Sequence, residues 1–278
     1  MYVRSIGRPA RGTVLTLHGG PGATHDYLLP LADLSARGYQ VVFYDQLGCG
    51  RSEVPRNSAL FTVERYVEEV EALRRKLHLG RVHLMGSSWG GLLALAYALR
   101  HPQGLQSLVT IGGLASVPFA AAEMARLRRR LPSGVRRELA RYESQGAYHA
   151  PGYLRAVDTF YRRHLCRLWP WPPEVQRSLA WVERRPVYPT MNGPNEFTIT
   201  GTLRYWDCTA RLGDIRTPTM VTGGRHDEVT PRVARQIHEG IAGSEWVTFR
   251  ESAHLPFWEE RARFRSVVGE FLDRHAAG

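Results

Sequence analysis

Lysine is almost absent from this chain of 278 residues, although the formal net charge at pH 7 is +11. Lys76 is the only lysine, so the positive charge comes from arginine. The arginines are scattered, and the densest group, at residues 126–137, fits the outer faces of helices. No RNA- or DNA-binding motif accompanies them, so we expect no nucleic-acid partner despite the basic charge.

Cysteines and long apolar runs are also scarce. The three cysteines, Cys49, Cys166 and Cys208, form no close pair, which argues against a disulfide framework or a zinc site. No cluster of metal ligands stands out, so we expect neither a metal nor an organic cofactor. No apolar run reaches the roughly 20 residues that span a bilayer, and residues 1–11 lack the apolar segment of a signal peptide. We expect a cytoplasmic protein with no membrane partner.

Short apolar, β-branched runs alternate with helical patterns through much of the chain. Strands are expected at residues 13–17, 40–44, 82–85, 108–111, 219–222 and 246–249, and helices at residues 63–77 and 89–100. Strands this apolar are covered on both faces. The alternation therefore predicts the α/β class, with a mostly parallel central sheet flanked by helices.

The alternation stops between residues 117 and 213. This stretch holds arginine-rich helical segments, a cluster of proline and tryptophan at residues 169–173, and a segment at residues 186–200 that resembles a loop. We expect residues 117–213 to form an inserted helical lid. Residues 1–116 and 214–278 would then form the α/β core.

One motif indicates a serine nucleophile. Gly86-Ser-Ser-Trp-Gly90 has the form G-x-S-x-G and lies between a predicted strand and a predicted helix. This is the context of the nucleophile in the α/β-hydrolase fold, where glycines permit a tight turn that exposes the serine. We therefore predict Ser88 as the nucleophile.

A serine hydroxyl is a weak nucleophile and needs a base that is oriented by an acid. In this fold the partners follow in the order Ser, Asp, His, each in a loop after a later strand. Asp227 and His254 occupy these places in the sequence. We predict them as the acid and the base, and we expect His254 to titrate with an apparent pKa of about 6–7.

A glycine-rich turn, His18-Gly-Gly-Pro-Gly22, follows the first strong strand. In this fold that turn supplies one amide of the oxyanion hole, and the residue after the nucleophile supplies the other. We assign these two amides to Gly20 and Trp89, and we expect His18 itself to be structural.

Four segments together resemble the proline iminopeptidase family of serine aminopeptidases. They are His18-Gly-Gly-Pro-Gly22, Asp45-Gln-Leu-Gly-Cys-Gly-Arg-Ser52, Gly86-Ser-Ser-Trp-Gly-Gly91 and Met191-Asn-Gly-Pro-Asn-Glu-Phe197. The segment Ile111-Gly-Gly-Leu-Ala-Ser-Val-Pro118 is similar to the tricorn-interacting branch of that family, which leaves strict proline specificity open. The segment before residue 13 is short, and whether it holds an early strand of the sheet is also open.

The resemblance implies that Glu196, in the lid, and Glu228, beside the triad aspartate, bind the free ammonium of a short peptide or amino-acid amide. Charge-assisted hydrogen bonds to carboxylates suit that group. We expect Leu114 and aromatic lid residues to line a pocket for the first side chain. The expected function is release of the N-terminal residue, proline or another apolar one, through an acyl-enzyme.

Other functions remain open at this point. A carboxylesterase, amidase or acyltransferase of the same fold would use the same triad on substrates without a free amine. A hydrolase-like receptor with little turnover is a further alternative, but such proteins usually lose a triad member. The sequence does not determine the preferred N-terminal residue, the physiological substrate or the oligomeric state.

Overall fold

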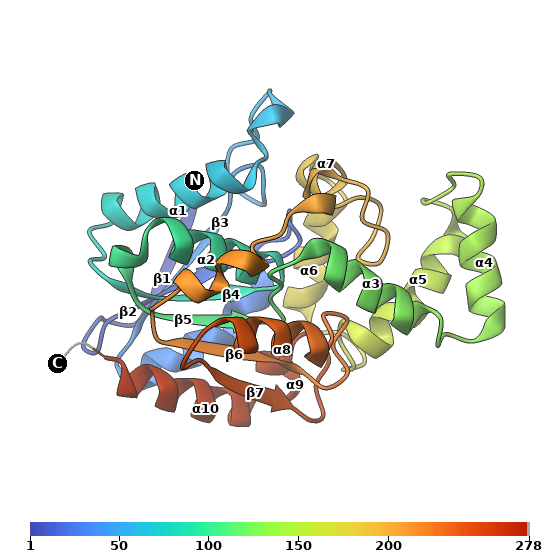
Figure 1. Ribbon diagram of the computed structural model, residues 1–278. Coiled ribbons are helices and arrows are strands. Elements are labelled where there is room, and N and C mark those ends of the chain that lie inside the picture. Colours follow the sequence, from blue (N-terminus) through green and yellow to red (C-terminus); the bar gives the residue numbers. More distant parts are fainter. Residues whose placement is uncertain (277–278) are drawn as a thin grey trace.

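The computed structural model describes residues 1–276, in which a seven-stranded sheet forms the centre of the molecule (Figure 1). The strand order is β1-β3-β2-β4-β5-β6-β7. Neighbouring strands are parallel except for β1, which pairs antiparallel with β3. The strands are Tyr2–Ile6 (β1), Thr13–Leu17 (β2), Gln40–Asp45 (β3), Val82–Ser87 (β4), Leu105–Ile111 (β5), Thr219–Gly224 (β6) and Glu245–Phe249 (β7).

The six strands expected from the sequence are all present, and most extend by one to three residues beyond the predicted runs. Strand β1 was not predicted. Its residues are only half-buried or exposed, so it lacks the apolar run that marks the other strands. Its place comes from backbone pairing with β3, with Tyr2 opposite Asp45. The segment before residue 13 therefore does contribute a strand, at the edge of the sheet.

Side chains from the strands alternate between two apolar clusters on opposite faces of the sheet. Val42 and Tyr44 of β3 belong to the cluster that also holds α1 (Val63–Lys76) and α2 (Trp89–Arg100). Val41 and Phe43 belong to the other cluster, with the 3₁₀ helix His25–Arg37 and α10 (Arg261–Arg274). Burial on both faces is the reason that these strands read as continuous apolar runs.

The remaining α-helices either lie between β5 and β6 in the sequence or follow β6. The first group comprises α3 (Val117–Arg128), α4 (Ser133–Glu143), α5 (Pro151–His164), α6 (Pro173–Val182) and α7 (Val187–Met191). In Figure 1, α4 and α5 lie well to the side of the sheet. The second group comprises α8 (Pro231–Gly240) and the short α9 (Pro256–Glu259). Among the described residues, no helix combines the length and the hydropathy needed to cross a bilayer.

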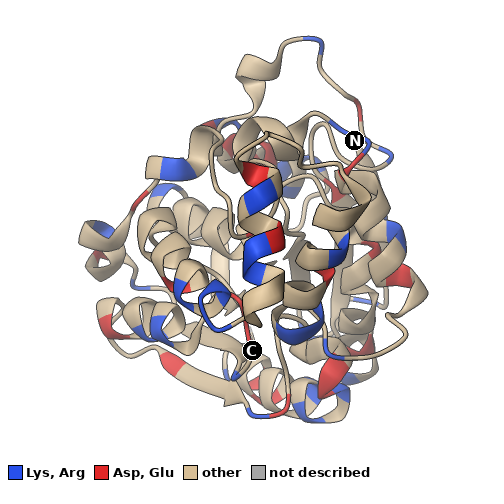
Figure 2. Ribbon diagram, turned by 90° about the vertical axis from the view of Figure 1, so that its right-hand side faces the viewer, with Lys and Arg blue, Asp and Glu red and all other residues tan. Residues whose placement is uncertain are grey.

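Basic and acidic residues are interspersed over the face shown in Figure 2. Several arginines of the segment between β5 and β6 pair with nearby carboxylates. Arg128 contacts Glu143, for example, and Arg162 contacts Asp158 one helical turn earlier. The Arg162–Asp158 pair is exposed, and an exposed pair contributes about 0–1 kcal/mol to stability.

Candidate active site

Ser88 lies in a tight turn between the end of β4 and the start of α2. Its φ of 58° and ψ of −122° are unusual for a residue with a side chain and indicate local strain. A Cβ at Gly86 would collide with the carbonyl oxygen of Gly90, and a Cβ at Gly90 would collide with that of Leu17. The two flanking glycines are therefore required by the turn that presents Ser88.

Asp227 and His254 lie in the loops after β6 and β7, and both are buried. Nδ1 of His254 donates a hydrogen bond of 2.6 Å to Oδ1 of Asp227. Gly112, at the end of β5, has a φ of +55°, and a Cβ there would lie 2.7 Å from Nδ1 of His254. The absence of a side chain at Gly112 thus lets the parallel strands bring the pair together.

The other ring nitrogen of His254 is available for chemistry. Nε2 has no hydrogen-bond partner within residues 1–276. His254 and Ser88 line the same pocket, although no hydrogen bond joins them in the described part of the chain. The arrangement has a carboxylate and an imidazole in contact, with the hydroxyl of Ser88 in the pocket that the ring also lines.

Glu259 holds the loop that carries His254. Its Oε2 accepts hydrogen bonds from the amides of Ala253 (2.9 Å) and Leu255 (3.2 Å), which flank the histidine. Its Oε1 accepts a hydrogen bond of 2.8 Å from the amide of Arg167, between α5 and α6. Burial raises the pKa of Glu259, while these three amides favour its ionised form. One carboxylate therefore fixes the backbone on both sides of the base.

The segments that carry the amides of Gly20 and Trp89 are joined through Gln46. The indole Nε1 of Trp89 donates to Oε1 of Gln46 (2.8 Å), and Nε2 of Gln46 donates to the carbonyl of His18 (2.8 Å). The amide of Gln46 also donates to Nε2 of His18 (3.0 Å). Burial lowers the pKa of His18 to about 4, so its ring is neutral, as expected for a structural residue.

Glu196 and Glu228 are brought to the same place although 31 residues separate them in the chain. Glu228 is buried and Glu196 is half-buried, and both line the pocket that contains Ser88. Tyr188 donates a hydrogen bond of 2.7 Å to Oε1 of Glu196. Oε2 of Glu228 has no partner among the described residues. Burial raises the pKa of both groups, and the charge of Glu196 raises the pKa of Glu228 further.

The electrostatics around His254 differ from the sequence-based expectation of a pKa near 6–7. Burial lowers the pKa of the ring, but the charge and hydrogen bond of Asp227 and the charges of Glu228 and Glu196 outweigh it. The net effect raises the pKa of His254 to about 9. The expectation was wrong because it considered the histidine without the two glutamates that face it.

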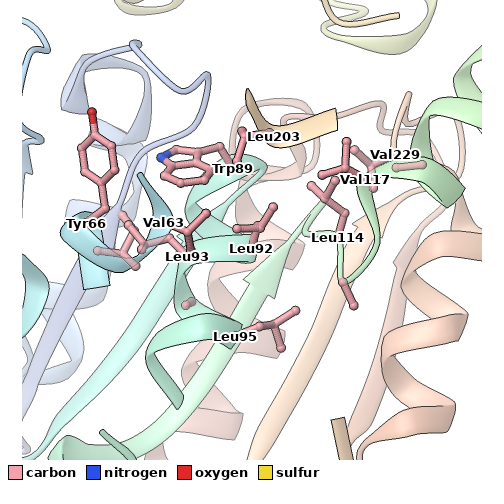
Figure 3. Packing of buried hydrophobic residues seen from close by; sticks show 14 of the residues in the cluster. Val63, Tyr66, Trp89, Leu92, Leu93, Leu95, Leu114, Val117, Leu203 and Val229 are labelled. Carbon is pink, nitrogen blue, oxygen red and sulfur yellow. The ribbon is translucent and has the colours of Figure 1, made fainter. Parts of the chain in front are cut away.

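Two pockets meet at Gly20, Ser88 and Glu196. The α6 pocket contains His254 and Glu228, and its apolar lining is Ala23, Leu165, Val175, Leu179, Val182 and Leu255. The α3 pocket contains Trp89 and Asn192, and apolar residues that line it include Leu92, Leu114, Val117, Met124, Leu203 and Val229. Figure 3 shows Leu114, Val117 and Val229 close together, and Leu203 beside Trp89.

Leu114 thus lies where the sequence analysis expected an apolar pocket. The expected aromatic lid residues do not line either of these pockets in the described part of the chain. Residues 117–213 contribute aliphatic side chains and Met124 instead. The aromatic side chains of that segment pack elsewhere, as Phe160 does against Phe197.

Four residues that hold the site together were not predicted from the sequence: Gln46, Gly112, Tyr188 and Glu259. Gln46 directly follows Asp45 in a motif that was noted only for its resemblance. Tyr188 and Glu259 had no signal in the sequence. Tyr188 acts through one hydrogen bond to Glu196, and Glu259 acts through bonds from three backbone amides, which no side-chain pattern marks. No group of three or more His, Cys, Asp or Glu side chains suited to a metal ion occurs among residues 1–276.

Comparisons with known proteins agree with this geometry. A family model described as the alpha/beta hydrolase fold matches residues 12–261. The proline iminopeptidase of Thermoplasma volcanium is 48% identical, over 95% of this chain and 90% of its own length. The proline iminopeptidase of Saccharolobus solfataricus is 47% identical, over 94% of this chain and 84% of its own length.

Solved structures show similarity over nearly the whole chain as well. VinJ superposes with a TM-score of 0.96 at 39% identity, over 99% of this chain and 95% of its own. The proline iminopeptidase of Mycobacterium smegmatis superposes with a TM-score of 0.91 at 38% identity, over 98% and 94%. An esterase from Exiguobacterium antarcticum, at 22% identity and a TM-score of 0.71, shares the fold.

Proposed function

This chain belongs to the proline iminopeptidase family of α/β hydrolases, and we propose that it releases the N-terminal residue of short peptides through Ser88, His254 and Asp227. It is a serine hydrolase of the prolyl aminopeptidase type. The observation that carries the proposal is that the buried Glu228 and the half-buried Glu196 line the same pocket as Ser88. Two neighbouring carboxylates that are partly or fully removed from water are costly without a cation, and a substrate ammonium would stabilise them.

The reaction begins when Oγ of Ser88 attacks the carbonyl carbon of the first residue. The hydroxyl proton passes to Nε2 of His254, while Asp227 holds Nδ1 and stabilises the imidazolium. The amides of Gly20 and Trp89 bind the oxyanion, and each such donor contributes roughly 2.7–4 kcal/mol to the transition state. Gln46 holds the two segments that carry these amides in a fixed position relative to one another.

The carbon–nitrogen bond then breaks, and His254 gives its proton to the leaving amine. Water attacks the acyl-enzyme, giving one proton to His254 as the new carbon–oxygen bond forms. The bond to Ser88 breaks, and the serine takes that proton back. The products are a free amino acid and either a peptide shortened by one residue or, from an amino-acid amide, the free amine. The chain's own residues carry out every step.

Residues 117–213 act as a lid over this site. They supply Glu196 together with Met124, Val175 and Leu179, which line the two pockets. Such a cover limits access to short substrates and excludes folded proteins. The α/β core, residues 1–116 and 214–278, supplies the triad. We place this peptide hydrolysis in the cytoplasm, where the three free cysteines would stay reduced.

A chromogenic comparison tests the proposal. Wild-type enzyme is assayed with the p-nitroanilides of proline, leucine and alanine, with their N-acetylated forms, and with p-nitrophenyl acetate. We expect fast cleavage of the free-amine anilides and little cleavage of the blocked ones. Equal cleavage of blocked and free anilides would refute the aminopeptidase assignment, and a strong preference for the ester would favour a carboxylesterase.

A further inference from the structure

The two pockets differ in which part of the catalytic machinery they contain. Among the residues that line them, His254 belongs to the α6 pocket, whereas Trp89 belongs to the α3 pocket. Gly20, Ser88 and Glu196 lie where the pockets meet. The substrate's carbonyl carbon must sit at this junction, because Ser88 attacks it there.

The proton from His254 fixes the direction of the substrate. To protonate the leaving nitrogen, Nε2 must come within about 2.6–3.2 Å of it. Since Nε2 lies in the α6 pocket and has no partner among residues 1–276, the leaving nitrogen must be on that side. We propose, building on the aminopeptidase function above, that the α6 pocket binds the second residue of the substrate and selects an apolar, uncharged side chain there.

The face that α6 presents to the pocket supports this selectivity. Val175, Ser178, Leu179 and Val182 are spaced as one face of a helix. The hydroxyl of Ser178 is engaged with Thr24, accepting from its amide (2.9 Å) and donating to its carbonyl (3.1 Å). These bonds anchor α6 to the loop that follows Gly20 and leave aliphatic carbon facing the substrate.

The polar groups of the α6 pocket disfavour an acidic second residue in particular. Glu228 and Glu196 would repel its carboxylate, and the aliphatic wall would strip away its water. By the same orientation, the side chain of the first residue enters the α3 pocket, between Leu114, Val117 and Val229 (Figure 3).

The test measures kcat/KM for release of proline from Pro-Leu-NH₂, Pro-Ala-NH₂ and Pro-Asp-NH₂. Wild-type enzyme should prefer leucine over aspartate at the second position by at least about tenfold. Leu179→Arg should raise the Asp/Leu ratio by about tenfold or more, because it replaces an apolar wall with a cation. Gln176→Arg, on the exposed side of the same helix, adds the same charge and should leave the ratio unchanged.

A second variant, in the other pocket, distinguishes the proposed substrate orientation from a folding defect and from the reverse orientation. Met124→Ala, in the α3 pocket, should alter the preference among proline, leucine and alanine p-nitroanilides while leaving the Asp/Leu ratio at the second position unchanged. If Leu179→Arg instead changes the first-residue preference, or if it leaves the Asp/Leu ratio unchanged, the proposal is wrong. Cleavage of N-acetylated substrates tests the aminopeptidase function separately, since it does not depend on which pocket holds the second residue.

Discussion

Oε1 of Glu228 lies 4.0 Å from Nε2 of His254, the ring nitrogen that faces away from Asp227. The glutamate that we propose to bind the substrate ammonium is therefore also a charge beside the histidine that we propose as the base. A bound ammonium would offset that charge and make the imidazolium less stable. Substrate binding and the readiness of the base to accept a proton are linked through this contact.

The pH dependence of the free enzyme follows from this relationship. Protonated His254 cannot accept the proton of Ser88, so activity falls below its pKa of about 9. With p-nitrophenyl acetate, which carries no amine, kcat/KM should rise with pH until that value is reached. Glu228→Gln removes a charge that raises the pKa of His254, so its acid limb should move to lower pH. Glu270→Gln, at an exposed site, is the control; identical profiles for all three proteins would contradict the coupling.

Recognition of the ammonium is tested by Glu196→Gln. The substitution removes one charge-assisted hydrogen bond to the substrate, worth roughly 1.5–3 kcal/mol. We expect kcat/KM for proline p-nitroanilide to fall by about 10- to 150-fold. Hydrolysis of p-nitrophenyl acetate should change only a few-fold. Equal losses on both substrates would show that Glu196 supports the lid or the triad instead.

The nucleophile has a matched control in the next residue. Ser88→Ala should abolish turnover while the far-UV circular dichroism spectrum and Tm stay near those of the wild type. Ser87→Ala removes the neighbouring hydroxyl, whose Oγ has no hydrogen-bond partner among the described residues, and should keep most of the activity. A Ser88→Ala enzyme that retains a tenth of wild-type activity would overturn the assignment. His254→Ala should cost about as much as Ser88→Ala, because triad losses are not additive.

Glu259 should behave as a positioning residue for His254. Glu259→Gln replaces one accepting oxygen with a donating NH₂ group, which opposes either the amide of Arg167 or the two amides flanking the histidine. We expect kcat to fall by about tenfold or more with little change in KM, since each charged hydrogen bond is worth roughly 1.5–3 kcal/mol. The downfield NMR signal of the His254 Nδ1 proton should shift. An unchanged signal together with a lower Tm would indicate a role in stability alone.

The strands and the positions of Ser88, Asp227 and His254 after them could be predicted because each depends on a short stretch of sequence. An apolar run marks a strand buried on both faces, and the turn after it carries Ser88, Asp227 or His254. Parallel strands end at the same edge of the sheet, so the order of the motifs alone indicated that these side chains meet. Strand β1 escaped prediction because an edge strand is half exposed and is held by backbone pairing.

Only the tertiary structure decided how charges from distant segments act on one another. The expectation that Glu196 and Glu228 act at the same place came from family resemblance, because the sequence around neither residue predicts it. The pKa of His254 depends on Asp227 and on both glutamates, and Coulomb energies depend on distances that the sequence does not contain. The aliphatic lining of the α6 pocket was likewise set by how α6 docks on Thr24. The local sequence determines which helices and strands form. The packing of these elements against one another determines the electrostatic field and the pocket shape that the substrate meets.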